Sequence, residues 1–110
     1  MFKVIMLEEA KSFLYSLKQP VIDKIIYNID RVSGGEKNAE LFKKLENTDI
    51  WEFRTLYNKT CYRLFAFWDT EKEALVVATH GIVKKTQKTP SKEIKRAQEI
   101  RNQYFVNKTK

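Results

Sequence analysis

Three consecutive strand-like runs are the feature that most constrains the fold of this chain. Aromatic and polar side chains alternate over residues 50–57, as in a strand with two different faces. A two-residue turn at 58–59 leads to a second run at 60–68, and a polar loop leads to a third from 74 to about 80. Such short connections predict an antiparallel three-stranded meander.

Two short helices are expected ahead of this meander. A strand-forming run at residues 2–6 comes first,, and apolar side chains then recur at three- and four-residue steps on either side of Pro20,. Pro20 breaks the first helix and suits the first turn of the second. The tight connection predicts a helical hairpin packed on one face of the sheet. Residues 36–48 support no clear prediction.

A third helix is expected after the meander. Thr89 and Pro90 match an N-cap and first-turn proline pair, and Glu93 follows near the positive end of the helix,. At 110 residues, the chain has the size of one domain. We therefore predict a single α+β domain over residues 1–110, in which an N-terminal strand and a helical hairpin pack on a twisted antiparallel sheet with a C-terminal helix.

The charge balance favours a polyanionic partner. Lys and Arg total 21 against 14 Asp and Glu, for a net charge of +7, which attracts nucleic acid over long distances. A merely solvated basic surface is equally compatible with this composition. Cys61, the only cysteine, allows no intramolecular disulfide and no four-cysteine metal site, and we assign it to the core. We expect no metal and no small-molecule cofactor.

The N-terminal residues give no sign of export or membrane anchoring. Glu8 and Glu9 interrupt the first apolar stretch too early for a secretory signal, and no run approaches transmembrane length,. We expect a cytoplasmic protein without a membrane partner.

The sequence lacks the residues of several familiar catalytic sites. It contains no glycine-rich phosphate loop, no serine nucleophile elbow, no closely spaced carboxylate pair and only one histidine,. What remains is a set of cations on two neighbouring predicted strands and just beyond the third. These are Arg54, Arg63, Lys84, Lys85 and Lys88.

Each of these cations has a structural interpretation as well as a functional one. Arg63 lies on a strand face that is otherwise apolar, which is costly unless the guanidinium finds a partner, and an ion pair with Glu52 would supply one. The three lysines approach the positive end of the last helix, where a phosphate would be attracted. Clustered loop lysines are, however, commonly just solvated.

A cluster of this kind can cleave RNA without a metal. RNA supplies its own 2′-hydroxyl as nucleophile, so a protein needs only to orient that oxygen and stabilise charge on the phosphorane. A lysine crowded by other cations can act as a general base near neutral pH. Arginine is suited to clamping phosphate oxygens.

Three segments of the chain resemble one known family. WEFR, CYRLFAF and, most specifically, THGIVKKTQKTPSKEIKRA are similar to the core of HigB-like toxins, the phage-derived branch of the RelE/ParE superfamily. The resemblance implies a RelE-like fold and an endoribonuclease that cleaves messenger RNA in the ribosomal A site, in contact with ribosomal RNA. It also implies neutralisation by a helix-turn-helix antitoxin encoded adjacently.

The resemblance further implies roles for residues at matching positions. Arg63 matches the family's phosphate-contacting arginine, and Arg54 matches a basic position on the preceding strand. The implied catalytic set is Arg54, Arg63, Lys84 and Lys85. Lys88 is a weaker match to the family's basic segment, and it joins His80 and Tyr62 as the candidate RNA-binding set. Within this set, Tyr62 could stack on a base, whereas a histidine at a strand end is often a hydrogen-bonded structural residue.

Two other functions stay open beside the nuclease. A degenerate toxin that binds RNA or the ribosome without cleavage, and is still neutralised by an antitoxin, would carry the same residues. A structural protein that docks on another protein through its basic surface is the third possibility. Steep weakening of binding with salt would favour RNA over a protein partner.

Overall fold

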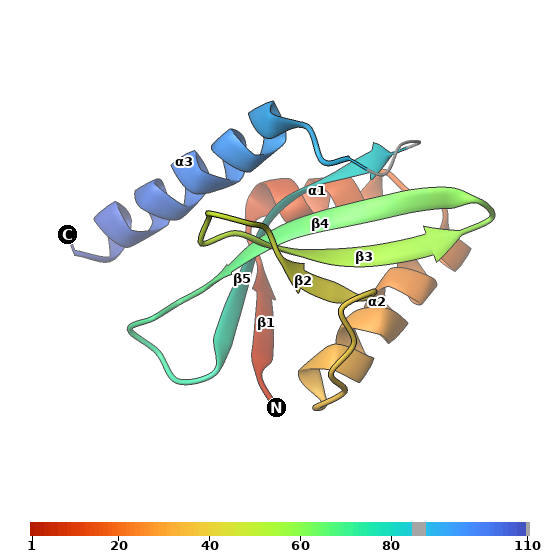
Figure 1. Ribbon diagram of the computed structural model, residues 1–110, viewed down its shortest axis with the longest axis horizontal. Coiled ribbons are helices and arrows are strands. Elements are labelled where there is room, and N and C mark those ends of the chain that lie inside the picture. The colour runs from red at the N-terminus through yellow and green to blue at the C-terminus, as the bar shows by residue number, and fades with distance from the viewer. Residues whose placement is uncertain (85–87, 110) are drawn as a thin grey trace.

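The computed structural model describes residues 1–84 and 88–109, and these form one sheet with helices on both faces (Figure 1). The elements in chain order are β1 Lys3–Met6, α1 Glu8–Tyr15, α2 Gln19–Ser33, β2 Phe42–Lys44, β3 Trp51–Tyr57, β4 Thr60–Trp68, β5 Leu75–Lys84 and α3 Ser91–Lys108. The predicted α+β fold, with its N-terminal strand, helical hairpin and C-terminal helix, is therefore confirmed.

The predicted meander consists of β3, β4 and β5, which pair antiparallel in that order. At the β3–β4 turn, Asn58 and Lys59 have φ angles of 48° and 64°, the two positive values that a type I′ hairpin turn requires. β5 continues past the predicted end at His80 because its ladder with β4 extends to the pair of Lys84 and Cys61. Lys84 is thus the last residue of the strand rather than part of a following loop.

The sheet is mixed, because its first strand runs parallel to its neighbour. In the order β1-β5-β4-β3-β2, β1 lies at one edge and pairs parallel with β5. The α1–α2 hairpin then carries the chain to the other edge, where β2 pairs with β3. Alternation identifies a strand but not the direction of its partner, so the sequence pattern did not distinguish a wholly antiparallel sheet from this one.

The α1–α2 hairpin covers one face of the sheet, as predicted. Phe53 and Leu64 of the sheet pack there against buried side chains of the two helices, which are Ala10, Leu14, Val21, Ile25, Ile29 and Val32. Gly81 makes the contact with α1 possible, since a Cβ atom at this position would lie 2.2 Å from Cδ2 of Phe13. Only glycine permits so close an approach of helix to strand.

α3 lies on the opposite face, and Figure 1 shows α2 and α3 on opposite sides of the strands. Ala97, Tyr104 and Phe105 pack on Phe65 and Phe67 in a second apolar cluster. These contacts close one half of the face. The other half, toward the β3–β4 turn, is the part that carries charged side chains.

The start of α3 differs from the prediction. Pro90, with φ −62° and ψ 134°, occupies the N-cap position, and no side chain caps the helix. Thr89 is therefore not the N-cap. Its hydroxyl donates to Oε2 of Glu52 at 3.0 Å instead, so the residue before the helix is tied to the middle of the sheet.

Candidate functional site

Four polar side chains meet at the uncovered half of the sheet. The ladder places Arg54 opposite Arg63 and Cys61 opposite Lys84, and directly paired residues project from the same face of a sheet. All four line one cleft of about 580 Å³, a size within the range of about 300–1,000 Å³ that is typical of sites for small molecules. The sequence-predicted residues Arg54, Arg63 and Lys84 are thus brought together.

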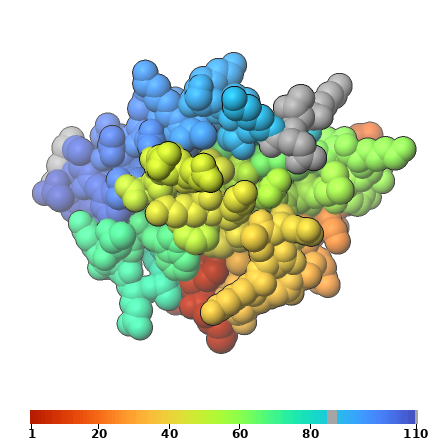
Figure 2. Space-filling view, viewed as in Figure 1, coloured from red at the N-terminus to blue at the C-terminus, as the bar shows by residue number. Residues whose placement is uncertain are grey.

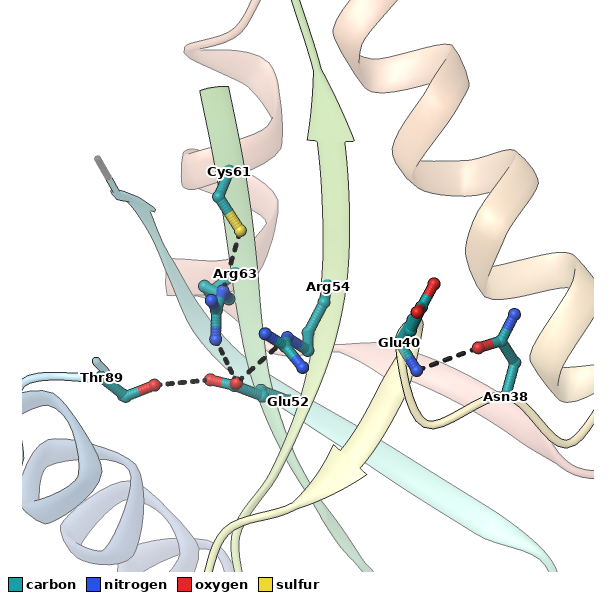
Figure 3. Close-up of polar contacts among 7 residues, drawn as sticks. All are labelled: Asn38, Glu40, Glu52, Arg54, Cys61, Arg63 and Thr89. Carbon is teal, nitrogen blue, oxygen red and sulfur yellow. Dashed lines mark hydrogen bonds and ion pairs between the residues drawn. The ribbon is translucent and has the colours of Figure 1, made fainter. Parts of the chain in front are cut away.

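Glu52 lies at the centre of this arrangement, where Figure 3 shows Arg63, Arg54 and Thr89 converging on its carboxylate. Arg63 is 2% exposed, and its guanidinium contacts Oε1 of Glu52. Nε of Arg54 lies 3.6 Å from the same oxygen. Nε of Arg63 also donates to Sγ of Cys61 at 2.9 Å. The ion pair with Glu52 that the sequence offered as a structural explanation for Arg63 is therefore present, and Arg63 also lines the cleft.

Lys84 is buried without a partner in the part of the chain that the structure describes. Its side chain lines the cleft, the residue is 4% exposed, and Nζ makes no hydrogen bond to any described residue. Burial lowers the pKa of Lys84, and the nearby positive charge of Arg63 lowers it further. A buried ammonium with a lowered pKa can bind an anion when charged or accept a proton when neutral.

The cleft has a large excess of positive charge. Among the described residues that line it, the acidic side chain is Glu40 and the cationic ones are Lys24, Arg31, Arg54, Lys59, Arg63 and Lys84. Two of these cations come from α2 and one from the β3–β4 turn. Arg31 is engaged by Glu36 at 2.6 Å, and Arg54 and Arg63 contact Glu52. The lining still carries more positive than negative charge, which concentrates anions.

One wall of the cleft is formed by the segment that connects α2 to β3. In Figure 2 the yellow segment that leads from α2 through β2 to β3 lies in front of the sheet, below α3. Leu41, just before β2, and Glu40 contribute this segment to the cleft wall. The part of the sequence that supported no clear prediction therefore builds one side of the site.

His80 does not reach the cleft. It is buried, its ring stacks on Phe65 with 4.9 Å between centroids, and Nε2 lies 3.2 Å from Oε1 of Glu93 while Nδ1 lies 2.9 Å from Oγ1 of Thr79. Burial lowers the pKa of His80, against an opposing effect of Glu93. The contacts are those of a residue that joins β5 to the first turn of α3.

The other predicted RNA-binding residues are also apart from the cleft. Tyr62 pairs with Thr55 and Val83 and packs with the core under the helical hairpin, on the face opposite Arg63. Lys88 is exposed and does not line the cleft. Lys85 lies outside the described residues.

Several residues of the cleft were missed or misassigned from the sequence, and Cys61 and Lys24 are examples. Cys61 was assigned to the core, but it is half-buried and lines the cleft. Lys24 lies on α2, and nothing in the sequence indicated that this helix would approach the end of β3. The signal for Cys61 was present in the strand alternation, because Cys61 shares its face with Arg63.

No metal site or membrane span is found among the residues that the structure describes. Over the ranges 1–84 and 88–109, no three His, Cys, Asp or Glu side chains are grouped closely enough to hold a metal ion. Within the same ranges, none of the helices combines the length and the apolar character needed to cross a bilayer.

Comparison with known proteins identifies the family. The family described as phage-derived protein Gp49-like matches residues 12–102. The structure is similar to a chain of the intact E. coli RelBE toxin–antitoxin complex, with a TM-score of 0.57 and 18% identity, covering 80% of this chain and 100% of that chain. No curated protein sequence matches significantly. The chain has a RelE-like fold, and it belongs to the Gp49-like family of phage-derived proteins.

Proposed function

We propose that this protein is the toxin of a toxin–antitoxin pair and cleaves messenger RNA on the ribosome without a metal. The observation that carries the proposal is the buried ammonium of Lys84, which has no hydrogen-bond partner among the described residues and shares one concave site with two arginines. Such a site is complementary to a phosphodiester, whose charge increases in the transition state. Membership of the Gp49-like family and the RelE-like fold support the same function.

Each of the cleft residues has a separate role in the proposed reaction. Arg54 and Arg63 bind the phosphate oxygens and stabilise charge on the phosphorane. Lys84, in its neutral form, takes the proton of the 2′-hydroxyl, and the 2′ oxygen bonds to phosphorus. The bond from phosphorus to the 5′ oxygen breaks, and the leaving 5′ oxygen takes up a proton from solvent. Glu52 holds both arginines in place, and is a positioning residue.

Lys85 and Lys88 are proposed as further phosphate contacts, on the basis of the sequence motif. His80 and Tyr62 are left out of the proposed site, because one is bound to Glu93 and the other packs on the opposite face. The residues proposed to act on the phosphate and the 2′-hydroxyl, Arg54, Arg63 and Lys84, therefore lie on β3, β4 and β5.

The proposed partners follow from the resemblance to HigB-like toxins. The substrate is messenger RNA in the ribosomal A site, where the basic surface also meets ribosomal RNA, and the inhibitor is a helix-turn-helix antitoxin encoded adjacently. The similarity to a chain of a toxin–antitoxin complex supports an antitoxin partner. This assignment places the protein in the cytoplasm.

Mapping of transcript ends after induction in a bacterial host tests the proposal. The wild-type protein is expected to cut translated messages, and Lys84→Met is expected to reduce cutting by a factor of about 100 or more, as for loss of a general base. Lys72→Gln, which removes an exposed lysine in the β4–β5 loop, is the matched control and should cut like the wild type. Equal cutting by Lys84→Met and the control would refute the assigned role of Lys84.

A non-catalytic RNA-binding module is the second candidate, and one observation favours it. Glu52 already neutralises much of the charge of Arg63, which reduces what this arginine can give to a transition state. The same induction experiment separates the two functions. Growth arrest with intact transcripts, together with co-sedimentation of the protein with ribosomes, would favour binding alone.

A further inference from the structure

Cys61 lies in an unusual position for the only cysteine of the sequence. It is half-buried at the start of β4, lines the cation-rich cleft, and pairs in the ladder with Lys84. Its Sγ accepts the 2.9 Å hydrogen bond from Nε of Arg63. Reaction of a cysteine depends on its access to solvent and on positive charge near the sulfur, and both conditions are met here.

Lys84 supplies a second and independent indication of a ligand. Its Nζ is buried in the wall of the same cleft and makes no hydrogen bond to any residue that the structure describes. Leaving a buried ammonium unpaired is costly, so a carboxylate held near Cys61 would gain a strong partner. The adjacent cations Lys24, Arg54 and Lys59 attract the same class of ligand,.

We propose that Cys61 is a site of S-thiolation by small anionic disulfides, of which oxidised glutathione is the representative. We further propose that the bound group fills the cleft and blocks access of an RNA phosphate. The first statement rests on the geometry of the cleft, and the second rests on the function proposed above. Modification of Cys61 would in this way make the activity of the protein sensitive to the redox state of its surroundings.

The reaction is a thiol–disulfide exchange. The thiol of Cys61 loses its proton to solvent, its sulfur bonds to one sulfur of the disulfide, and the disulfide S–S bond breaks. Cys61 is oxidised, one half of the reagent stays attached as a mixed disulfide, and the other half leaves reduced as a thiol. The carboxylates of an attached glutathionyl group can then pair with Lys84 and the neighbouring cations of the cleft.

The rate of adduct formation tests the first statement, measured by intact-protein mass spectrometry. Oxidised glutathione is negatively charged and cystamine is positively charged, so the comparison isolates charge. At low salt we expect the native protein to react about tenfold faster with oxidised glutathione, and at 0.5 M salt we expect a difference of less than about threefold, because salt screens attraction to the cleft. In 8 M urea the preference should be lost.

Two variants assign the preference to the cleft rather than to the net charge. Lys84→Met should slow the reaction with oxidised glutathione by a factor of about five to ten, whereas Lys72→Gln, which removes the same charge from an exposed loop, should change it less than about twofold. Equal rates for the two disulfides on the native protein, or equal effects of the two variants, would overturn the proposal. If Lys84→Met fails to fold, the salt and urea arms on the wild type decide the question.

Binding of a fluorescent single-stranded RNA tests the second statement. Thiolation of the wild type should weaken binding about tenfold, and dithiothreitol should restore it. Cys61→Ser should form no adduct, and its affinity should be the same before and after treatment. An adduct that forms with the expected charge preference but leaves RNA binding unchanged would overturn blockage of the cleft. Absence of RNA binding before any treatment would instead count against the proposed function.

Discussion

Two buried carboxylates lie on the α3 side of the sheet, and their surroundings differ in charge balance. Asp69, just after β4, is 1% exposed and accepts hydrogen bonds of 2.7 Å from both Lys108 and the hydroxyl of Tyr104. Glu52, on β3, is equally buried and holds Arg63, Arg54 and the hydroxyl of Thr89. The first cluster fastens the end of α3 to the sheet, and the second lines an open cleft.

The difference lies in what each cluster leaves unpaired. At Asp69, one cation faces the buried carboxylate, and Lys108 also contacts Glu71 at 3.1 Å. At Glu52, two arginines share one carboxylate, and Lys84 nearby has no hydrogen-bond partner among the described residues. Within the described chain, the cluster at Asp69 has no surplus of cations and connects α3 to the sheet. The cluster at Glu52 has more cations than carboxylates, which favours binding of an anion from outside the chain,.

Removal of Glu52 should have the largest effect. Glu52→Ala leaves two arginines and Lys84 close together with no buried carboxylate between them. Loss of one partner of a buried ion pair lowers the free energy of unfolding by about 3–5 kcal/mol. Urea unfolding followed by circular dichroism measures this change. A decrease in the free energy of unfolding of less than about 1 kcal/mol would mean that water already screens the charges around Glu52.

Removal of the charge at Asp69 should cost less. Asp69→Asn weakens the bonds from Lys108 and Tyr104, but Lys108 is partly exposed and recovers hydration, so we expect a loss of about 2 kcal/mol. RNA cleavage by the folded protein should be unchanged, because Asp69, Tyr104 and Lys108 do not line the cleft. A stable variant with impaired cleavage would contradict the separation of the two clusters.

The pH dependence of this loss follows from the titration of Asp69. Burial raises the pKa of the carboxyl, but the hydrogen bonds from Lys108 and Tyr104 outweigh burial and hold the pKa below its ordinary value of 3.8. A lowered pKa in the folded state means that the stabilisation is complete above pH 3.8 and is lost as the pH falls through the folded value. Urea unfolding from pH 6 to pH 2 should therefore show the wild type and Asp69→Asn converging at the acid end.

Replacement of Lys84 should have a smaller effect of the opposite sign on stability. Lys84→Met removes a buried ammonium without a hydrogen-bond partner in the described chain and fills its place with an apolar side chain, so we expect a gain of about 1 kcal/mol. Cleavage of RNA should be lost at the same time. A destabilised variant would show that Lys84 is paired in solution.

Alkaline pH should reduce the difference in free energy of unfolding between Lys84→Met and the wild type. Burial, with the charge of Arg63, holds the pKa of Lys84 below its ordinary value of 10.5. Between the folded and unfolded pKa values the unfolded chain binds the extra proton, so the stability of the wild type rises with pH relative to the variant. The gap measured by urea unfolding should be widest at neutral pH and close as the pH approaches 10.5.

The smallest effect is expected at the rim of the cleft. Lys24 lies on α2 and is only partly buried. Lys24→Gln should weaken RNA binding about threefold and lower the slope of log affinity against log salt by about one, as for loss of one phosphate contact. Lys72→Gln should leave both quantities unchanged. Identical salt slopes for the two variants would place Lys24 outside the RNA path.

Periodicity alone predicted most of the elements, and it also grouped part of the site. Residues 50–57 alternate regularly, and the turn residues that follow separate them from a second run at 60–68, so both strands and the turn were predicted within a residue or two. Because Arg54 and Arg63 fall on matching faces of these strands, their proximity followed from the register. These features depend only on neighbours along the chain and across one tight turn.

The features that the sequence did not predict depend on contacts between distant segments. β2 has three residues, too few for a recognisable period. The parallel pairing of β1 with β5 joins residues about 70 positions apart. A local sequence pattern does not indicate which distant strand will be the partner. Thr89 has a side chain that is suited to an N-cap, but its hydroxyl donates a hydrogen bond to Glu52, 37 positions away in the sequence.

The sequence by itself determined the α+β class, the order of the elements other than β2 and the cationic character of the protein, because these follow from side-chain period and composition. Only the tertiary structure decided that Lys84 lies in one cleft with Arg54 and Arg63. Folding buried Lys84 without a hydrogen-bond partner among the described residues, beside Arg63 and in the same cleft as Cys61. Burial and charge balance are properties of the surroundings of a residue, and those surroundings exist only when the chain has folded.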